Sequence, residues 1–110
     1  MRTDATGALF KILADPTRRQ ILDLLAERGP LNVSQLAAEF PGLVASGISK
    51  HLMGLRATGL VQADRDGRQQ IYRIDAAKVT GTLAPWLTKY ERYSSAALER
   101  LRDAAENDAD

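Results

Sequence analysis

From Leu43 to Ile74 the chain reads LVASGISKHLMGLRATGLVQADRDGRQQIYRI, and this stretch decides the fold. Its first half predicts a helix at about residues 44–58. At about 100° per residue, one narrow face of that helix is apolar, and it carries Ile48, Leu52 and Leu55. Because such a face must be buried, the stretch predicts a helix that packs on a core.

A β-hairpin is predicted directly after this helix. Gly59 favours the end of the helix, because glycine readily adopts positive φ just past a last turn. Two strands follow at 60–65 and 69–74, and Asp66-Gly67 between them is a strong turn signal. A helix followed at once by such a hairpin is the arrangement of a winged helix-turn-helix. We therefore expect a mainly α fold with a small β-hairpin wing.

The opposite face of the 44–58 helix has an unusual composition for a surface helix. It offers one cation, one hydroxyl group and otherwise small or slender side chains, whereas a solvated face usually carries several charges. This suits the major groove of DNA, in which Lys50 and Ser46 are candidates for contact with base edges. Ser49 is a candidate for a base or phosphate contact, and Met53 for contact with a thymine methyl group. The candidate DNA-binding residues of this helix are Ser46, Gly47, Ser49, Lys50 and Met53.

The tip of the predicted wing is basic. Arg65 and Arg68 flank the turn, where they would lie on the DNA backbone or reach the minor groove. Residues 41–73 hold five basic and two acidic side chains, although the net charge of the whole chain is only +1. The helix and hairpin thus form the positive part of the chain, as contact with phosphates requires. From charge alone, a solvated hairpin with chance charges remains the alternative.

The first half of the chain predicts three further helices. A first helix is predicted by apolar residues at helical spacing from Ala8 to Leu13. Because Phe10 lies on a different side, this helix needs two surfaces to pack against. Asp15-Pro16 starts a second helix, as N-cap and first helical position, and Gly29-Pro30 ends it. A short third helix begins with a capping box and precedes the 44–58 helix at helix-turn-helix spacing. The two residues of that capping box are Asn32 and Gln35.

A long helix is predicted near the end of the chain. Asp75 is a candidate N-cap for a helical segment directly after the hairpin. Pro85 favours the first turn of a new helix or a kink, so residues 75–84 are expected to form a separate short turn and the long helix to run over 85–102. One side of this helix carries an apolar stripe that advances in steps of four and three, a spacing typical of helix-to-helix packing. The stripe consists of Leu83, Leu87, Tyr90, Ser94, Ala97 and Leu101.

Three polar residues admit two interpretations each. Arg18 and Arg19 lie in the first turn of the second helix, which is unfavourable for the helix dipole. A pair with Asp15 or Asp23 is the preferred interpretation, and a phosphate partner is the alternative. His51 lies beside the buried face of its helix, where we expect a packed, locally hydrogen-bonded side chain in preference to a phosphate contact.

Taken together, these segments resemble the ArsR-type family of bacterial winged-helix repressors. The matching segments are LADPTRRQILDLL at 13–25, VSQLAAEF at 33–40, ISKHLMGLRATGLV at 48–61 and DRDGRQQIYRID at 64–75. PWLTKYERY at 85–93 is similar to a subgroup whose last helix carries an aromatic stripe. The resemblance implies a homodimer joined through the first and last helices, and a repressor that an effector releases from its operator. It also indicates the subgroup without the cysteine metal-sensing motif, because the chain has no cysteine.

The predicted dimer surface combines apolar residues of the first and last helices. Trp86, Tyr90 and Tyr93 belong to it, and lining a pocket for an aromatic small-molecule effector is the less favoured interpretation of these three residues. The whole predicted surface consists of Leu9, Phe10, Leu13, Leu83, Trp86, Leu87, Tyr90, Tyr93, Ala97 and Leu101.

Several classes of protein are excluded or disfavoured by composition. With no cysteine and one histidine, the chain cannot form disulfides or thiolate sites and does not favour a zinc site. No nucleophile motif or phosphate-binding glycine loop is present, so neither an enzyme nor a cofactor is expected. No segment reads as a signal peptide or membrane span, which predicts a cytoplasmic protein without a membrane partner. We expect one domain at 1–102 and an acidic, disordered tail at 103–110.

The predicted function is that of a homodimeric, sequence-specific DNA-binding regulator, most simply a repressor on a palindromic operator. The alternative is a winged-helix module that binds another protein and has no sequence-specific DNA binding. The basic wing and the nearly uncharged helix face favour DNA, whereas the modest net charge favours the alternative.

Overall fold

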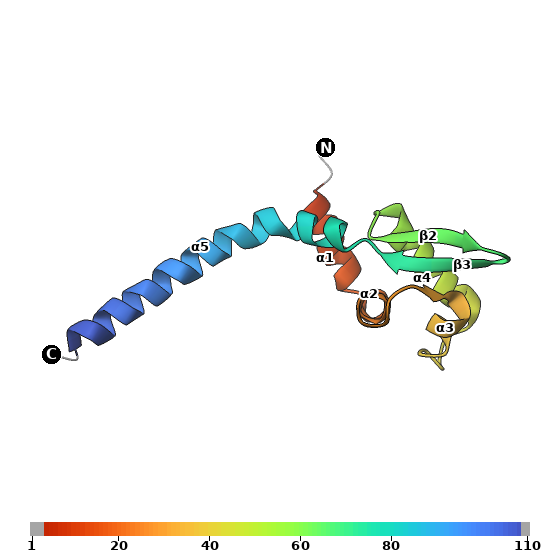
Figure 1. Ribbon diagram of the computed structural model, residues 1–110, viewed down its shortest axis with the longest axis horizontal. Helices are drawn as coiled ribbons and strands as arrows, with labels where there is room; N and C mark the ends of the chain where they lie inside the picture. The colour runs from red at the N-terminus through yellow and green to blue at the C-terminus, as the bar shows by residue number, and fades with distance from the viewer. Residues whose placement is uncertain (1–3, 109–110) are drawn as a thin grey trace.

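The structure is a computed structural model that describes residues 4–108, which form five helices and three short strands (Figure 1). The N-terminal part is a group of helices with a small sheet at one side, and the last helix projects away from it as a long arm (Figure 1). The elements in chain order are α1 (Ala5–Leu13), α2 (Pro16–Arg28), β1 (Leu31–Asn32), α3 (Val33–Ala37), α4 (Ala45–Ala57), β2 (Val61–Asp66), β3 (Gln69–Ile74) and α5 (Ala76–Asp108).

The starts of α2 and α3 follow from side-chain caps that the sequence predicted. The Asp15 carboxylate accepts the backbone N–H groups of Thr17 at 2.9 Å and Arg18 at 3.2 Å. Asn32 and Gln35 form a full capping box, in which each side chain accepts the backbone N–H of the other residue. Caps of this kind satisfy N–H groups that a helix start leaves free, and each stabilises its helix by about 1 kcal/mol.

The core confirms the apolar face predicted for α4. Ile48, Leu52 and Leu55 are fully buried, and they meet apolar side chains of α1, α2, α3 and the sheet. Truncation of such a side chain would cost about 2–5 kcal/mol of folding free energy. The remaining core residues are Leu9, Ile12, Ile21, Leu22, Leu25, Leu31, Leu36, Phe40, Leu60, Val61 and Tyr72.

The sheet has three antiparallel strands in the order β1-β3-β2. The hairpin β2–β3 is the predicted wing, and Gly67 in its turn has a φ of 64°. The sequence did not predict β1, which is only two residues long and pairs Leu31 with Tyr72 of β3. Because of this pairing, the base of the wing is attached to the start of α3.

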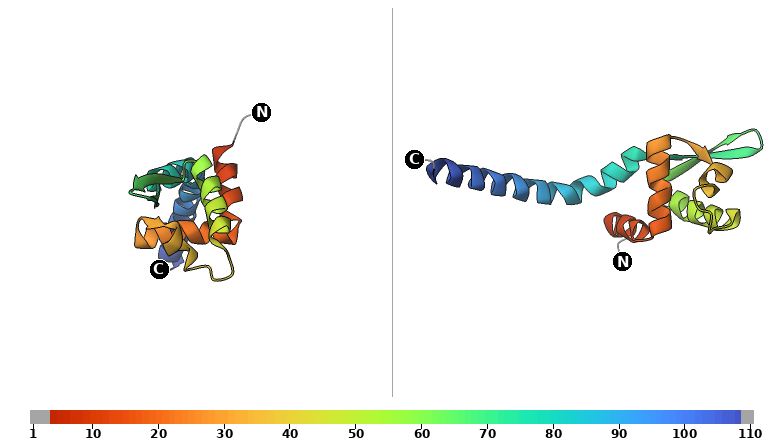
Figure 2. Two further views of the ribbon diagram at one scale, coloured as in Figure 1. Left: turned by 90° about the vertical axis from the view of Figure 1, so that its right-hand side faces the viewer. Right: turned by 90° about the horizontal axis from the view of Figure 1, so that it is seen from below.

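The last helix differs from the prediction at Pro85. The structure has one helix from Ala76 to Asp108 with Pro85 inside it, so the predicted separate turn at 75–84 is wrong. Asp75 accepts the backbone N–H of Lys78 at 3.0 Å and starts the helix where an N-cap was predicted. Pro85 cannot donate a backbone hydrogen bond, and proline bends a helix that it does not end. α5 accordingly bends where its colour passes from teal to blue (Figures 1 and 2).

α5 also continues through residues 103–108, for which the sequence predicted a disordered tail. The structure gives helix there, consistent with the strong helix propensity of Ala104, Ala105 and Glu106. Residues 109 and 110 lie outside the described residues, and a domain boundary at residue 102 stays a prediction. The molecule measures 70 × 36 × 25 Å along its principal axes. No helix of the described part, α5 included, has the length and apolarity that a membrane crossing needs.

Candidate nucleic-acid interface

The outward face of α4 forms a shallow hollow of about 470 Å³. Lys50 is the only charged residue among those that line it, and Met53 is 68% exposed. All five candidate residues predicted on this helix line the hollow, together with one more residue, Val44. The lining consists of Val44, Ser46, Gly47, Ser49, Lys50 and Met53. The structure thus brings the predicted residues of α4 together on one face, and their contact with DNA stays a prediction.

Val44 is the residue of this face that sequence reasoning missed. It is the N-cap of α4, makes no side-chain cap hydrogen bond and is 70% exposed. A branched apolar N-cap is unusual, because Ser, Thr, Asp and Asn are the residues preferred there. This departure from the preferred N-cap residues was the feature of the sequence that could have identified Val44 as a candidate. The helix start therefore offers an apolar side chain beside Ser46, and no acidic residue occupies its first turn. An N-terminus of this kind favours phosphate over a cation.

The wing presents two arginines of the predicted interface near its tip. Arg65 and Arg68 are exposed, and the Arg65 Nε donates to the Gly67 carbonyl at 3.3 Å. Arg73, nearer the base of the wing, is instead paired with Asp64 at 2.8 Å. Within residues 4–108, neither Arg65 nor Arg68 forms an ion pair. Their charges are therefore available to a partner.

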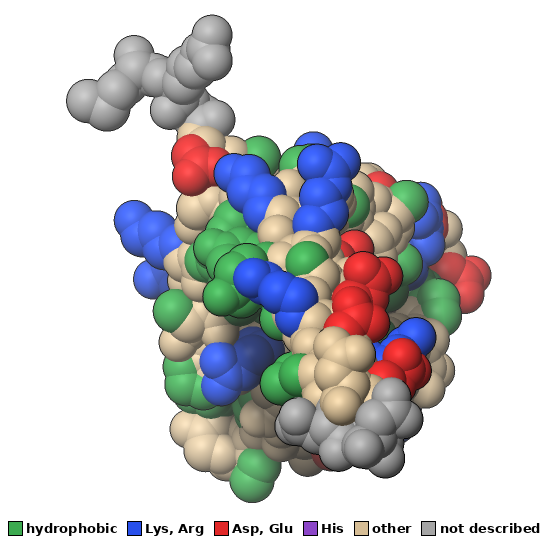
Figure 3. Space-filling view, turned by 90° about the vertical axis from the view of Figure 1, so that its left-hand side faces the viewer, with side chains coloured by type: hydrophobic (Ala, Val, Ile, Leu, Met, Phe, Trp, Pro, Cys, Tyr) green, Lys and Arg blue, Asp and Glu red, His purple; other side chains and the backbone are tan. Residues whose placement is uncertain are grey.

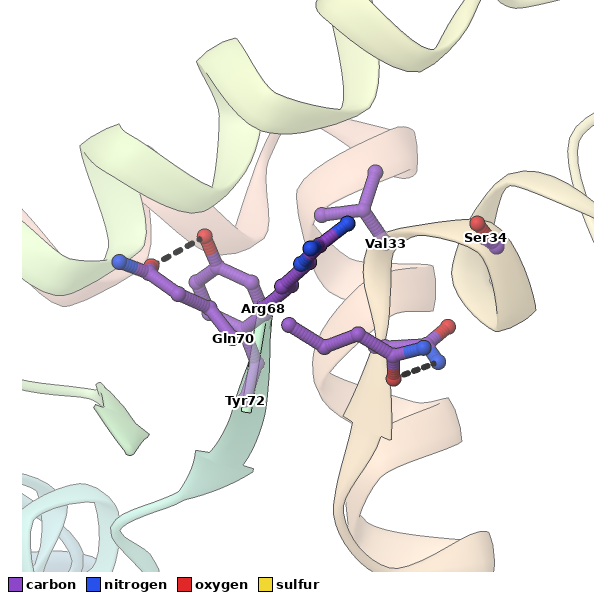
Figure 4. A pocket seen from close by; sticks show the side chains of 7 residues that line it. Val33, Ser34, Arg68, Gln70 and Tyr72 are labelled. Atoms are coloured by element: carbon purple, nitrogen blue, oxygen red, sulfur yellow. Dashed lines mark hydrogen bonds between the residues drawn. The ribbon is translucent and has the colours of Figure 1, made fainter. Parts of the chain in front are cut away.

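A second hollow, of about 320 Å³, lies between the wing and the start of α3 (Figure 4). Its sides are held by two hydrogen bonds: Asn32 Nδ2 donates to Gln69 Oε1 at 2.9 Å, and the Tyr72 hydroxyl donates to Gln70 Oε1 at 3.1 Å. Arg68 lies between these two pairs (Figure 4). The sequence did not predict this hollow, because it depends on the β1–β3 pairing. It is lined by Asn32, Val33, Ser34, Arg68, Gln69, Gln70 and Tyr72.

The arginines at the start of α2 do not form the predicted pairs with Asp15 or Asp23. The Nε of Arg18 donates to Nδ1 of His51 on α4 at 3.3 Å, and Arg19 donates to the Leu13 carbonyl at 2.7 Å. The preferred interpretation of His51, a packed and hydrogen-bonded side chain, agrees with this contact. Asp15 uses its carboxylate as the cap of α2. The backbone N–H groups of Arg18 and Thr17 lower the pKa of this carboxyl, although burial opposes the shift.

Of the ten residues of the predicted dimer surface, five are exposed, four are half-buried and one is buried. Leu9 is 2% exposed within the chain's own core, so its assignment to the dimer surface is wrong. Leu13 and Leu83 are half-buried and pack against that core. Ala97 is half-buried on the arm. The more exposed members, with Leu98 beside them, are Phe10 (39%), Leu87 (40%), Tyr90 (53%), Tyr93 (69%), Leu98 (63%) and Leu101 (68%).

Aromatic rings join α1 to the base of the arm. Phe10 and Trp86 meet edge to face with ring centroids 4.9 Å apart, and Tyr90 lies 4.7 Å beyond Trp86. Seen along α5, hydrophobic side chains gather on the flank nearer the start of α1 (Figure 3). Trp86 also lines a hollow of about 370 Å³ with Phe10, but Tyr90 and Tyr93 do not line it. Of the three aromatic residues of α5, Trp86 alone therefore lines this hollow. Among residues 4–108, no three His, Cys, Asp or Glu side chains are grouped as a metal site would require.

Comparison with known proteins gives related sequences and related structures. Residues 15–63 match the family model described as "Bacterial regulatory protein, arsR family". Rv0081 of Mycobacterium tuberculosis, an HTH-type transcriptional regulator described as uncharacterized, is 44% identical over 75 residues. Those residues are 68% of this chain and 65% of Rv0081, so the chain matches less than two thirds of that relative's length.

Two of the related solved structures align with this chain over most of their length. An ArsR-like transcriptional regulator from Rhodococcus sp. RHA1 is 32% identical with a TM-score of 0.67, over 86% of this chain and 91% of that one. Mb0332 of Mycobacterium bovis, described as a homodimeric winged helix-turn-helix DNA-binding domain and a possible ArsR-family regulator, is 33% identical with a TM-score of 0.62, over 84% of each chain. The chain therefore has the winged helix-turn-helix fold and belongs to the ArsR family of bacterial regulatory proteins.

Proposed function

We propose that this chain is a homodimeric repressor that binds a palindromic DNA operator through α4 and the wing. The observation that carries the proposal is the outward face of α4, where the predicted contact residues line one hollow with a single cation among them. Membership in a family of transcription regulators supports it, as does the Mb0332 domain, whose title describes DNA binding and a homodimer.

α4 would enter the major groove with its N-terminal half. Lys50 has the chemistry to donate to guanine O6 and N7, and Ser46 can serve several bases. Met53 and Val44 present apolar groups of the kind that contact thymine methyls. Arg65 and Arg68 would hold the wing on phosphates, or reach the adjacent minor groove. In this arrangement α4 supplies sequence specificity and the wing supplies salt-dependent affinity.

The dimer would form through α1 and α5. The exposed apolar side chains of the arm leave a surface that one chain of this size does not cover, and the heptad-like spacing of the stripe suits a second helix. A two-fold dimer would present two α4 helices about one DNA turn apart, roughly 34 Å, which is why a palindromic operator is proposed. Release by a small-molecule effector belongs to the same proposal, and such an effector would not act through thiols because the chain has none.

A protein partner on the same face is the second candidate. Leu43, Val44 and Met53, on α4 and just before it, are 40%, 70% and 68% exposed, an unusual group of apolar side chains for one surface. A partner protein could cover them in place of DNA.

One binding experiment separates these two functions. Fluorescence anisotropy would follow the full chain binding the DNA upstream of its own gene and a scrambled duplex of equal length, each at 50 mM and 200 mM salt. We expect preference for the upstream DNA by a factor of about 10³ or more, with affinity falling as salt rises. Equal, weak affinity for both duplexes would favour the protein-binding module.

A further inference from the structure

The side chain of Arg18 leaves α2 and crosses to the recognition helix α4. Its Nε donates to Nδ1 of His51 at 3.3 Å. Its guanidinium lies against Gly54, where a Cβ atom would be 3.1 Å from one terminal nitrogen and 3.2 Å from Cζ. Contacts this short are tighter than ordinary packing, so a side chain at position 54 would require the guanidinium to shift by a few tenths of an ångström.

The charge of this guanidinium is not neutralised by the contact. The acceptor of this hydrogen bond is an imidazole nitrogen of His51, which carries no negative charge that could neutralise the guanidinium. The Asp15 carboxylate accepts from backbone N–H groups and forms no ion pair with Arg18. Within residues 4–108, Arg18 forms no ion pair and its two terminal nitrogens make no hydrogen bond. Four N–H donors of Arg18 therefore remain available.

The location of Arg18 is at the edge of the proposed DNA-binding face. Gly54 follows Lys50 by four residues, so the two positions are about 40° apart around α4 and one turn apart along it. Arg18 thus brings a cation from a different helix to the flank of the face that carries Lys50.

We propose that Arg18 binds a phosphate of the DNA backbone, and that His51 positions its guanidinium over Gly54 for this contact. The proposal rests on the DNA-binding function proposed above. Arginine binds phosphate through two parallel N–H donors, and the terminal nitrogens of Arg18 are the ones left free. Holding the Nε beforehand lowers the side-chain entropy lost on binding. α2 would therefore contribute to the DNA interface, and His51 would be a positioning residue rather than a contact.

The first test is the salt dependence of DNA binding. Arg18→Gln keeps an N–H donor at the position of Nε but removes the charge and the two terminal nitrogens. We expect the slope of log K against log salt to fall by about 0.9, the value of one phosphate contact, with equal losses on operator and scrambled duplex. Arg19→Gln is the matched control, because Arg19 is the adjacent arginine and donates to Leu13 instead. The slope of log K against log salt for Arg19→Gln should equal that of the wild-type chain.

The second test concerns positioning. His51→Ala removes the acceptor and should weaken operator binding roughly two- to tenfold, the effect of one lost hydrogen bond, while the salt slope is retained. His51→Asn places an amide oxygen near the position of Nδ1 and should restore most of the affinity. A side chain that only packs α4 on α2 would not be rescued in this way.

A third variant keeps the proposal testable if Arg18→Gln does not fold. Gly54→Ala favours the helix by its propensity but forces the guanidinium to move, so operator affinity should fall while the melting temperature does not. The proposal is overturned if Arg18→Gln lowers the melting temperature but leaves the salt slope unchanged, or if Gly54→Ala binds as the wild type does. Failure of the wild-type chain to bind its operator would instead contradict the proposed function, and with it this contact.

Discussion

The indole ring of Trp86 stands at 75° to the ring of Phe10, with the two centroids 4.9 Å apart. This contact fixes α5 to α1 at the base of the arm, beside the hydrogen bond from the Thr6 hydroxyl to the Thr82 carbonyl at 3.3 Å. Beyond this point no other residue of the described range 4–108 buries the large apolar side chains of the arm. The arm is therefore held at its base and left with an uncovered stripe, which a second copy would cover.

The double variant Leu87→Ala with Leu101→Ala tests that dimer. Both leucines are exposed within one chain, at 40% and 68%, so their truncation should cost the single chain little folding free energy. In a dimer they would be buried, and each truncation would cost about 2–5 kcal/mol. Sedimentation should therefore show a folded monomer that loses a full palindromic site far more than a half-site.

Leu43→Ala is the control for this variant, because Leu43 is also 40% exposed but lies outside the arm. Its sedimentation should be that of the wild type. A double variant that remains a dimer with unchanged operator affinity would show that the interface lies elsewhere.

The wing should contribute affinity without sequence preference. Arg68→Ala is expected to weaken binding to operator and scrambled DNA alike, and to lower the salt slope by about 0.9, because one phosphate contact is lost. Arg73→Ala is the control, since its guanidinium is already paired with Asp64 at 2.8 Å. Titrations at four salt concentrations measure both slopes, and equal slopes for Arg68→Ala and the wild type would remove the wing tip from the interface.

Substitution of Gly47 by alanine is expected to change folding stability and DNA binding in opposite directions. A Cβ added there meets nothing within 4 Å, and alanine is favoured over glycine inside a helix by about 1 kcal/mol. Gly47→Ala should therefore raise the melting temperature, while the added methyl group obstructs the close approach of DNA to α4 and weakens operator binding. Gly81→Ala, in an equally open position on α5, should raise stability and leave DNA binding unchanged. Tighter operator binding by Gly47→Ala would mean that DNA does not approach α4 at this point.

Divalent transition metals should not act as the effector. The chain has no cysteine and one histidine, whose Nδ1 is occupied by Arg18. Zinc sites need three or four ligands and prefer His and Cys. Micromolar zinc added to the operator complex in an anisotropy assay should leave the affinity unchanged. Zinc-dependent release that a chelator reverses would require an oxygen-rich site.

Much of the fold could be predicted because its signals are local. The spacing of Ile48, Leu52 and Leu55 identifies the buried face of α4, and Asp15 with Pro16 marks the start of α2. β1 could not be predicted, because two residues carry no periodicity and its strand character comes from pairing with β3. Pro85 was read as a helix start because proline usually ends a helix, whereas here the helix bends and continues.

Only part of the candidate site could be predicted from the sequence. The outward residues of α4 follow from the angle of each position around the helix, so the hollow they line could be anticipated. Leu9 was misassigned because α1 is apolar on two sides, and spacing alone does not say which side meets the chain's own core. The Arg18–His51 contact joins residues 33 positions apart on different helices, and no local pattern encodes it.

The central claim, that the outward face of α4 reads base sequence, is tested most directly by Lys50→Ala. Lys50 is the one charged residue of the hollow on α4, and a lost base contact costs about 1–3 kcal/mol of discrimination. The measurement is the ratio of affinities for operator and scrambled duplex, with Lys89→Ala on the arm as the control. We expect the ratio to fall roughly five- to 150-fold for Lys50→Ala and to stay unchanged for Lys89→Ala. Equal weakening on both duplexes would contradict the claim, because Lys50 would then contact only phosphate.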